Sequence, residues 1–371
     1  IITGRFIAAI LSALTILIVF RLANYLYNRK VAYLAAAFFT FTVLSIQQAH
    51  FLIVDGPQTF LVAWAMVFLV KVAMGDRRRD YYLAGLFIGL GMATKFSTAP
   101  IALAYILAHI LSMTRGRRRG FSNWIHWCLG GLTSIVTMTM VMPFWITDNK
   151  EFFRDITEQR NMVQGIISLP YTIQFEHTSP FVYMLKNMVL WSMGLPLGIA
   201  ALIGLAAAIR RIWKKPSDLG NIVIVSFVLP LLYFNGTFFA KFLRYTLVIM
   251  PFLAIFAARW LYGMKTWAGR GWARTITILV VLGSIGWAAA FQTIFLDPHT
   301  RIQASDWVYE NIPEGANIVQ ESSWDDALPV TTNTGRVSNY ETKQLGIYKE
   351  PDNERRAEIM ADVLEWGDVV I

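Results

Sequence analysis

One acidic residue of this chain stands where an apolar helix would enter a lipid bilayer. Asp55 lies in the stretch 49–60, AHFLIVDGPQTF, and opens its apolar helical part. An ionisable side chain at membrane depth is energetically expensive and is therefore a candidate functional residue. An acid that begins a helix also satisfies free backbone N–H groups, so a structural capping role is equally open for Asp55. His50 is a second candidate catalytic residue, although a structural histidine at the membrane interface is the commoner role for such a residue alone.

Two cations and a polar loop form the other candidate sites. Lys241 and Arg244, with Tyr245 directly after them, would share one helix face. The pair could bind a phosphate, with arginine as a planar fork and lysine as a point charge, and Lys95 could join them. Snorkelling of a long side chain to the membrane surface would explain either cation singly.

The outside stretch 176–183, EHTSPFVY, contains His177 and Tyr183 and either covers a cleft or only connects two spans. An acid, several cations and a covering loop on one membrane face favour chemistry on a lipid-borne phosphate. If a sugar leaves that phosphate, cations stabilise the leaving group and a carboxylate serves as base for an acceptor hydroxyl. The sequence contains no Ser-His-Asp arrangement, Walker loop or Gly-rich dinucleotide turn.

Composition sets the class of protein. Of the 371 residues 56% are hydrophobic and only 15% are charged, which excludes a soluble globular protein. The net charge of +9 comes mainly from short loops between apolar segments, so it indicates topology and not a nucleic-acid partner. Cys128 is the only cysteine, which excludes a disulfide framework and a Cys-based metal site.

The apolar segments predict a polytopic α-helical membrane protein, because a spanning helix needs roughly 20 apolar residues. We predict ten segments: 4–27, 31–50, 56–74, 81–94, 97–113, 121–146, 187–209, 219–236, 245–264 and 275–296. The short fourth and fifth segments should be separate helices that meet at Thr94-Lys95-Phe96, because one fused helix would put two basic loops on opposite sides. The glycines of the fourth segment, at 85, 89 and 91, indicate close helix packing.

Arginine and lysine fill every second gap between the segments. The positive-inside rule makes those gaps cytoplasmic, so Ile1 and the chain after Leu296 are expected outside. The basic gaps contain Arg29-Lys30, Arg77 to Arg79, Arg115 with Arg117 to Arg119, Arg210 to Lys215, and Lys265 to Arg274.

Two outer regions are expected in addition to the spans. Within the outer stretch 147–186, apolar residues at near-helical spacing predict an amphipathic helix on the membrane surface, with a plain solvated loop as the alternative. We divide the chain into a transmembrane domain, 1–296, and a truncated soluble α/β domain, 297–371. In the latter we predict helices at 303–311 and 353–366 and strands at 317–320 and 369–371.

These features together resemble the polyprenyl-phosphate-dependent glycosyltransferases of the GT-C fold, which include protein mannosyltransferases and the aminoarabinose transferases of lipid A. Each motif is loose alone, but the ordered set is fairly specific. The matching stretches are Gly4-Arg5, 49–60, 82–86 with 94–96, 177–183 with Leu190-Trp191, 241–245 with Pro251, and 304–315.

The resemblance implies transfer of a sugar from a polyprenyl-phosphate donor to a protein, lipid or glycan acceptor on the extracytoplasmic side of the cell membrane. It implies that Asp55 matches the family's second acidic position, with Lys241, Arg244 and Lys95 near the lipid phosphate. The family's principal catalytic acid would precede Ile1, so we expect it to be missing from residues 1–371. The resemblance leaves a divalent metal open as the one cofactor.

Two other functions remain open from the sequence. A transporter or flippase for a lipid-linked or anionic substrate is the chief alternative. Transporters place their sites near the bilayer midplane and often have repeated halves, whereas this chain has no repeat and gathers its polar groups at one face. A structural assembly protein that binds a partner through its outer tail is a third, weaker alternative.

Overall fold

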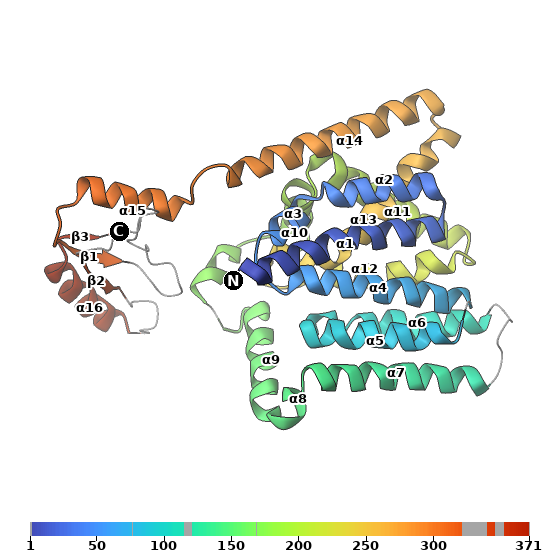
Figure 1. Cartoon of the computed structure of the whole chain (residues 1–371), viewed down its shortest axis with the longest axis horizontal. Coiled ribbons are helices and arrows are strands. Elements are labelled where there is room, and N and C mark those ends of the chain that lie inside the picture. The colour runs from blue at the N-terminus through green and yellow to red at the C-terminus, as the bar shows by residue number, and fades with distance from the viewer. Residues whose placement is uncertain are drawn as a thin grey trace. The chain divides into compact units, whose positions relative to one another are not determined.

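The protein is described here by a computed structural model that covers residues 2–75, 77–114, 121–167, 169–320, 340–345 and 352–370. Its contacts divide the chain into two compact units, Ile1–Phe291 and Gln292–Ile371. The first unit is a bundle of helices and the second is a small unit with a sheet (Figure 1).

All ten predicted membrane segments are helical. Eight stretches in the described part of the chain are long and apolar enough to cross a membrane, and the bent pair α2 and α3 raises the number to nine. Helix α5, with 16 residues, accounts for the remaining predicted segment. The polytopic helical fold is therefore confirmed. The main helices of the first unit are α1 (Ile2–Leu26), α2 (Arg29–Thr40), α3 (Val43–Ala49), α4 (Asp55–Met74), α5 (Arg79–Thr94), α6 (Ile101–Thr114), α7 (Phe121–Val141), α11 (Leu195–Lys214), α12 (Leu219–Thr237), α13 (Met250–Gly263) and α14 (Arg270–Gln292).

The predicted break at 94–96 is confirmed. Helix α5 ends at Thr94, the extended residue Lys95 follows, and the short helix η1 (Phe96–Thr98) leads into α6. Pro100 lies just before α6, and proline has no N–H to donate to the turn that precedes it. The break therefore places Lys95 at one end of the bundle.

Three predicted segments are interrupted where the sequence suggested continuous helix, and one of them is 31–50, which bends between α2 and α3. The segment 187–209 begins as α10 (Val182–Asn187) and one π-helical turn, η3 (Met188–Ser192), and α11 starts only at Leu195. Gly194 takes φ 79, and a Cβ there would lie 2.7 Å from Trp287 Cγ, so this position requires glycine. The segment 121–146 is interrupted after Val141, before Pro143 and the short helix α8 (Phe144–Thr147).

The core of the bundle lies around α13, which is buried along most of its length. Phe252 and Phe256 of α13 are almost completely buried. Helices α5 and α7 approach so closely that a Cβ on Gly85 would lie 2.0 Å from Gly130 O. The predicted close packing is thus confirmed at Gly85, and also at Gly89, where a Cβ would lie 2.4 Å from Ser134 O.

The outer stretch after α8 contains the predicted helix. Helix α9 (Asn149–Gln164) crosses the direction of α7 in the view of Figure 1, and Met162 is its one buried residue. Phe153 is 55% exposed, so α9 carries apolar surface that the bundle does not cover. Its place on a membrane surface stays a prediction.

The second unit has a three-stranded parallel sheet in the order β2-β1-β3. Strand β1 (Asn317–Gln320) and helix α16 (Asn353–Trp366) have their predicted bounds, α15 (Thr300–Asn311) starts three residues early, and β3 is Val369–Val370. Strand β2 (Glu341–Gln344) was not predicted, because its four residues are polar and exposed and lack the alternation of a half-buried strand. The core consists of Val308, Ile312, Ile318 and Tyr340.

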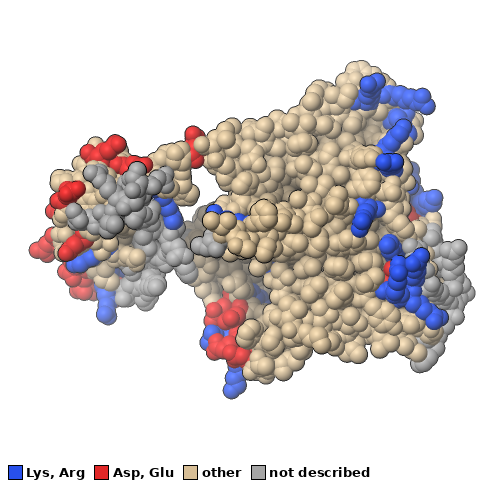
Figure 2. Space-filling view, in the orientation of Figure 1, with Lys and Arg blue, Asp and Glu red and all other residues tan. Residues whose placement is uncertain are grey.

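Charge separates the two ends of the helical bundle. Basic side chains gather at one end of the bundle, and the acidic residues of α9 lie at the other (Figure 2). Asp55 begins α4, whereas the basic run Arg77 to Arg79 follows the last residue of that helix. Asp55 and the basic loops therefore lie at opposite ends of the bundle.

Candidate active site

Asp55, which is buried, forms an ion pair with the partly buried Lys95. The Lys95 Nζ atom lies 2.7 Å from Asp55 Oδ1, and the side chains are 24% and 6% exposed respectively. Asp55 is in the first turn of α4 and Lys95 is at the break after α5, so the pair joins two helices. Loss of one partner of a buried pair leaves an uncompensated charge, which costs up to about 3–5 kcal/mol where burial is complete. The pair therefore fixes the position of the ammonium group of Lys95.

The side chain of Asp55 does not cap α4. The N-cap position of α4 is Val54, and no side chain caps the helix there. Within the described residues, the carboxylate of Asp55 has Lys95 as its one partner. Asp55 is therefore committed to a contact with another helix and not to its own helix end.

Gln58 stabilises the break that carries Lys95. It lies one turn after Asp55, is 3% exposed, and its Nε2 donates to Lys95 O and Ser97 Oγ at 3.3 Å each. Sequence reasoning missed Gln58, although an amide three residues after a membrane acid shares its helix face and was a usable signal. The first turn of α4 thus holds both the side chain and the backbone of Lys95.

Aromatic rings connect Lys95 to the second predicted site. Lys95 Nζ lies 4.9 Å from the centre of the Tyr245 ring, and Arg244 Cζ lies 5.8 Å from the same ring and 5.1 Å from that of Phe242. Cations are attracted to the faces of aromatic rings, particularly where water is partly excluded. Lys95, Arg244 and Tyr245 therefore lie together, as the sequence predicted. Phe242 belongs to the same cluster and was not predicted from the sequence.

Lys241 is placed differently from the prediction. It precedes the 3₁₀-helix η4 (Leu243–Ile249), so Lys241 and Arg244 do not share one helix face. The reason is tertiary, because the N–H groups of Phe239 and Ala240 both donate to Val163 O and hold this segment against α9. Lys241 is 4% exposed, whereas Arg244 reaches the surface.

Lys241 is a buried cation without an acidic partner among the described residues. Its Nζ donates to Thr178 Oγ1 at 3.0 Å and to Phe239 O at 3.3 Å. Burial lowers the pKa of Lys241, because removal from water disfavours the charged form. An anion at this position would restore the balance of charge.

The predicted loop lies over these cations. Helix η2 (Pro170–Phe175) leads into the predicted loop 176–183, and the ring of Phe175 meets those of Phe242 and Tyr183 edge to face at 4.9 and 5.9 Å. Thr178 adds the hydrogen bond to Lys241. The segment 170–183 therefore packs against the segment that carries Lys241 and Arg244.

The two predicted histidines are exposed. His50 ends α3, and its Nδ1 lies 2.8 Å from Ile46 O of the same helix. His177 has φ 58 in the turn before Thr178. Their assigned roles, in catalysis for His50 and in the substrate loop for His177, stay predictions.

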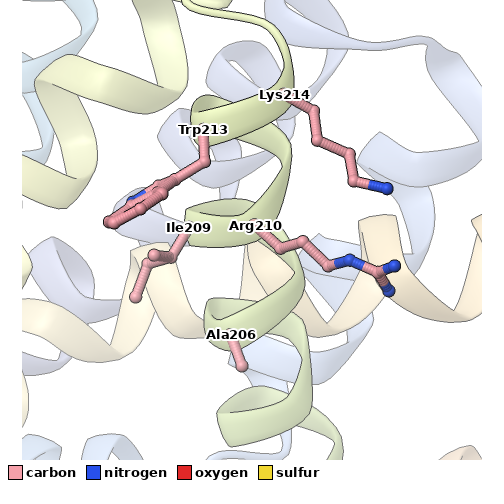
Figure 3. A pocket seen from close by; sticks show the side chains of 5 residues that line it. All are labelled: Ala206, Ile209, Arg210, Trp213 and Lys214. Atoms are coloured by element: carbon pink, nitrogen blue, oxygen red, sulfur yellow. The ribbon is translucent and has the colours of Figure 1, made fainter.

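Within the described ranges, no group of three or more His, Cys, Asp or Glu side chains is arranged to hold a metal ion. A shallow pocket of about 590 Å³ lies far from Asp55, on the last turns of α11. Trp213 and Ile209 point to one side of this helix and Arg210 and Lys214 to the other (Figure 3). This pocket belongs to the basic end of the bundle and not to the candidate site.

Solved structures show which class of protein has this fold. ArnT from Cupriavidus metallidurans bound to undecaprenyl phosphate matches 99% of this chain over 75% of its own length, with TM-score 0.60 and 13% identity. The apo oligosaccharyltransferase of Archaeoglobus fulgidus matches 99% of this chain with TM-score 0.53 and 14% identity, and this chain spans 58% of its length. AglB from the same organism, in complex with an inhibitory peptide and a dolichol-phosphate, gives TM-score 0.54 at 12% identity, over 97% of this chain and 57% of its own.

The chain therefore has the GT-C fold of the polyprenyl-phosphate-dependent membrane glycosyltransferases. Residues 2–146 match the family described as dolichyl-phosphate-mannose-protein mannosyltransferase. A comparison with curated proteins by sequence finds no match. The matched region contains Asp55 and Lys95, while Lys241 and Arg244 lie beyond it.

Proposed function

We propose that this chain is the membrane part of a glycosyltransferase that moves a sugar from a polyprenyl-phosphate donor to an acceptor hydroxyl. The observation that carries the proposal is the meeting of the Asp55–Lys95 ion pair with Tyr245, Arg244 and the neighbouring Lys241 at one end of a GT-C bundle. ArnT, with the same fold, was solved with undecaprenyl phosphate bound, and AglB with dolichol-phosphate and an inhibitory peptide.

The cations suit the leaving group of this reaction. When the bond between the sugar and the phosphate breaks, negative charge develops on the phosphate oxygen, and fixed cations nearby stabilise the transition state. Arg244 presents a planar fork at the surface and Lys241 a buried point charge, while Lys95 is held by Asp55 and Tyr245. The isoprenoid chain would lie against the apolar helices.

Asp55 has two compatible roles in this mechanism. Its carboxylate holds the ammonium group of Lys95 through an ion pair of 2.7 Å, which positions a cation for the phosphate. A carboxylate at this position can also accept the proton of an acceptor hydroxyl. The acceptor is a protein, a lipid or a glycan, and its hydroxyl would approach under the segment 170–183.

We also propose that the Asp55 end of the bundle faces the extracytoplasmic side. The basic loops at the other end would then be cytoplasmic, as the positive-inside rule predicts. The second unit would be extracytoplasmic, because α14 begins at the basic end and leads to it. Treatment of sealed right-side-out vesicles with external protease would test this orientation. We expect the second unit to be cleaved, and its resistance to the protease would contradict the proposed orientation.

The test of function is a transfer assay in vesicles that contain a polyprenyl-phosphate sugar. We expect the double variant Lys241→Ala with Arg244→Ala to raise the KM for the donor at least tenfold and to leave the KM for the acceptor nearly unchanged. The matched control, Arg210→Ala with Lys214→Ala, removes the same charge from the exposed basic end of α11. Movement of the donor lipid across the bilayer without sugar transfer would contradict the proposal and indicate a flippase.

A further inference from the structure

A second cluster of cations lies at the basic end of the bundle, outside the candidate active site. It surrounds a cavity of about 160 Å³ between α11, α12, α13 and the turn after α1. Two arginines line this cavity, Arg211 from the last turn of α11 and Arg259 from the last turns of α13. Neither arginine has a part in the proposed glycosyl transfer.

The two arginines are partnered differently. Arg211 Nε lies 2.7 Å from Asp218 Oδ2, and the same carboxylate oxygen accepts from Asn221 Nδ2 at 2.8 Å. Asn221 in turn accepts a hydrogen bond from the hydroxyl of Tyr27. Asp218 is the one acidic side chain that the described residues bring to this cluster, so it neutralises one guanidinium and is held in place by Asn221.

Arg259 has no such partner in the described part of the chain. Its guanidinium carbon lies 5.3 Å from the centre of the Tyr27 ring, and its Nε is buried without a hydrogen-bond acceptor. A buried donor without an acceptor costs free energy, and more so in a charged group. Two cations and one acid leave the cavity with one excess positive charge.

The walls of the cavity include two tryptophans, a residue typical of the membrane surface. Trp260 and Trp267 line it, and Trp267 is 69% exposed. Tryptophan gathers at the boundary between membrane and water, where its ring is half in each phase. Basic pockets between membrane helices at the cytoplasmic surface recognise the phosphates of lipid headgroups.

We propose that Arg259 and Arg211 form an anion site for a phosphate ester, separate from the site of glycosyl transfer. An oxygen of the phosphate accepts from Nε and the fork of Arg259, and the unpaired donors of Arg211 complete the contact. Phosphatidic acid in the membrane and free phosphate in solution share this chemistry. The cation–π contact with Tyr27 and the negative end of α13 are the alternative explanation for Arg259.

The experiment uses the whole protein, released from vesicles of phosphatidylcholine with phosphatidic acid, and native mass spectrometry to count bound lipid. We expect the wild type to retain one phosphatidic acid with about tenfold higher affinity than Arg259→Gln, because the variant loses the paired, charge-assisted hydrogen bonds from the guanidinium to the phosphate. Arg210→Gln is the matched control. It removes one exposed charge from the last turns of α11, at the same basic end of the bundle, and should bind phosphatidic acid as wild type does.

A second measurement keeps the proposal testable if Arg259→Gln does not fold. Arg259→Lys keeps the charge but loses the fork, and its affinity for phosphatidic acid should fall between those of wild type and Arg259→Gln. The thermal stability of wild type is also measured in inorganic phosphate and in chloride at equal ionic strength. Phosphate also stabilises folded proteins in general, so Arg259→Lys is measured beside wild type. Stabilisation by phosphate that is larger in wild type than in Arg259→Lys, without retention of phosphatidic acid, would support the site and identify a soluble anion as its ligand.

Two outcomes would overturn the proposal. One is an equal loss of phosphatidic acid from Arg259→Gln and Arg210→Gln, which would indicate general attraction to a basic surface. The other is a wild type that prefers neither phosphatidic acid over phosphatidylcholine nor phosphate over chloride.

Discussion

Two buried acids occupy the first turns of neighbouring membrane helices, Asp55 in α4 and Asp80 in α5, and they are 4% and 2% exposed. Asp80 accepts a hydrogen bond of 3.0 Å from the backbone N–H of Arg77, just before its own helix. Asp55 instead pairs with Lys95 from the end of α5. One acid stabilises a helix start, and the other links two helices at a site that contains further cations.

The comparison shows that the local pattern of an acid at a helix start does not reveal its role. Both positions complement the positive end of a helix dipole. The contacts differ in their reach along the chain. Asp80 accepts from the backbone N–H of Arg77, three residues before it, whereas Asp55 meets the ammonium group of Lys95 beside an aromatic ring. The contact of Asp80 with Arg77 is therefore local, and that of Asp55 depends on the break at Lys95.

The largest expected difference between the two acids is in activity. We expect Asp55→Asn to lower kcat for sugar transfer by at least about 100-fold, because general-base and charge contributions are typically of this size. Asp80→Asn should stay within a few-fold of wild type and lower stability by about 1 kcal/mol, as for the weakening of one hydrogen bond. Equal activities of the two variants in the vesicle assay would refute the active-site role of Asp55.

The next effect is the coupling between Asp55 and Lys95. A double-mutant cycle with Asp55→Asn, Lys95→Met and both together should give a coupling energy of about 1–3 kcal/mol in unfolding, because each single change leaves a buried polar or charged group unpaired. Denaturant unfolding in detergent measures it. The double variant should recover stability without recovering transfer, and recovered transfer would make the pair purely structural.

A smaller effect is expected from pH through Lys241. Burial lowers its pKa from the ordinary value of 10.5, so the charged form is lost at a lower pH than in an exposed lysine. A phosphate donor binds the protonated form, and donor KM should therefore rise several-fold as pH rises through this lowered pKa. Lys241→Arg should flatten the profile, because arginine stays charged. An unchanged profile in that variant would remove Lys241 from the phosphate site.

The smallest effect is expected at a surface ion pair. Arg154 and Glu151 of α9 pair at exposures of 59% and 50%. Exposed pairs contribute about 0–1 kcal/mol, so the same cycle with Glu151→Ala and Arg154→Ala should give a coupling below about 0.5 kcal/mol. A coupling as large as that of Asp55 and Lys95 would show that burial does not explain the difference between the pairs.

Much of the fold could be predicted because hydrophobic burial in a membrane has a simple signature. Runs of apolar residues and basic loops between them predicted the ten membrane segments, all of which are helical. The predictions that failed concern places where a single residue or a single pairing determines the local structure. The start of α11 depends on Gly194 and its contact with Trp287, and β2 has a polar sequence that only pairing with β1 makes a strand.

The candidate site was predictable in its residue types but not in its contacts. Asp55 was singled out because an ionisable group is rare at membrane depth, and Lys95 and Arg244 because they are cations on the outer side, against the positive-inside trend. The shared helix face of Lys241 and Arg244 was wrong, because Val163 accepts two backbone hydrogen bonds from the segment before Lys241 and holds it out of the helix. Gln58 and Phe242 become visible only when α4, the break after α5 and η4 meet.

The sequence by itself determined a polytopic membrane fold, the two differently charged ends of the bundle and the identity of the uncommon polar residues. These follow from the transfer of side chains between water and lipid, which depends on residue type and order along the chain. Only the tertiary structure decided that Asp55 pairs with Lys95, and that Arg259 lacks an acidic partner within the described residues. Those outcomes depend on distances between segments far apart in the chain, because electrostatic and hydrogen-bond energies fall steeply with separation.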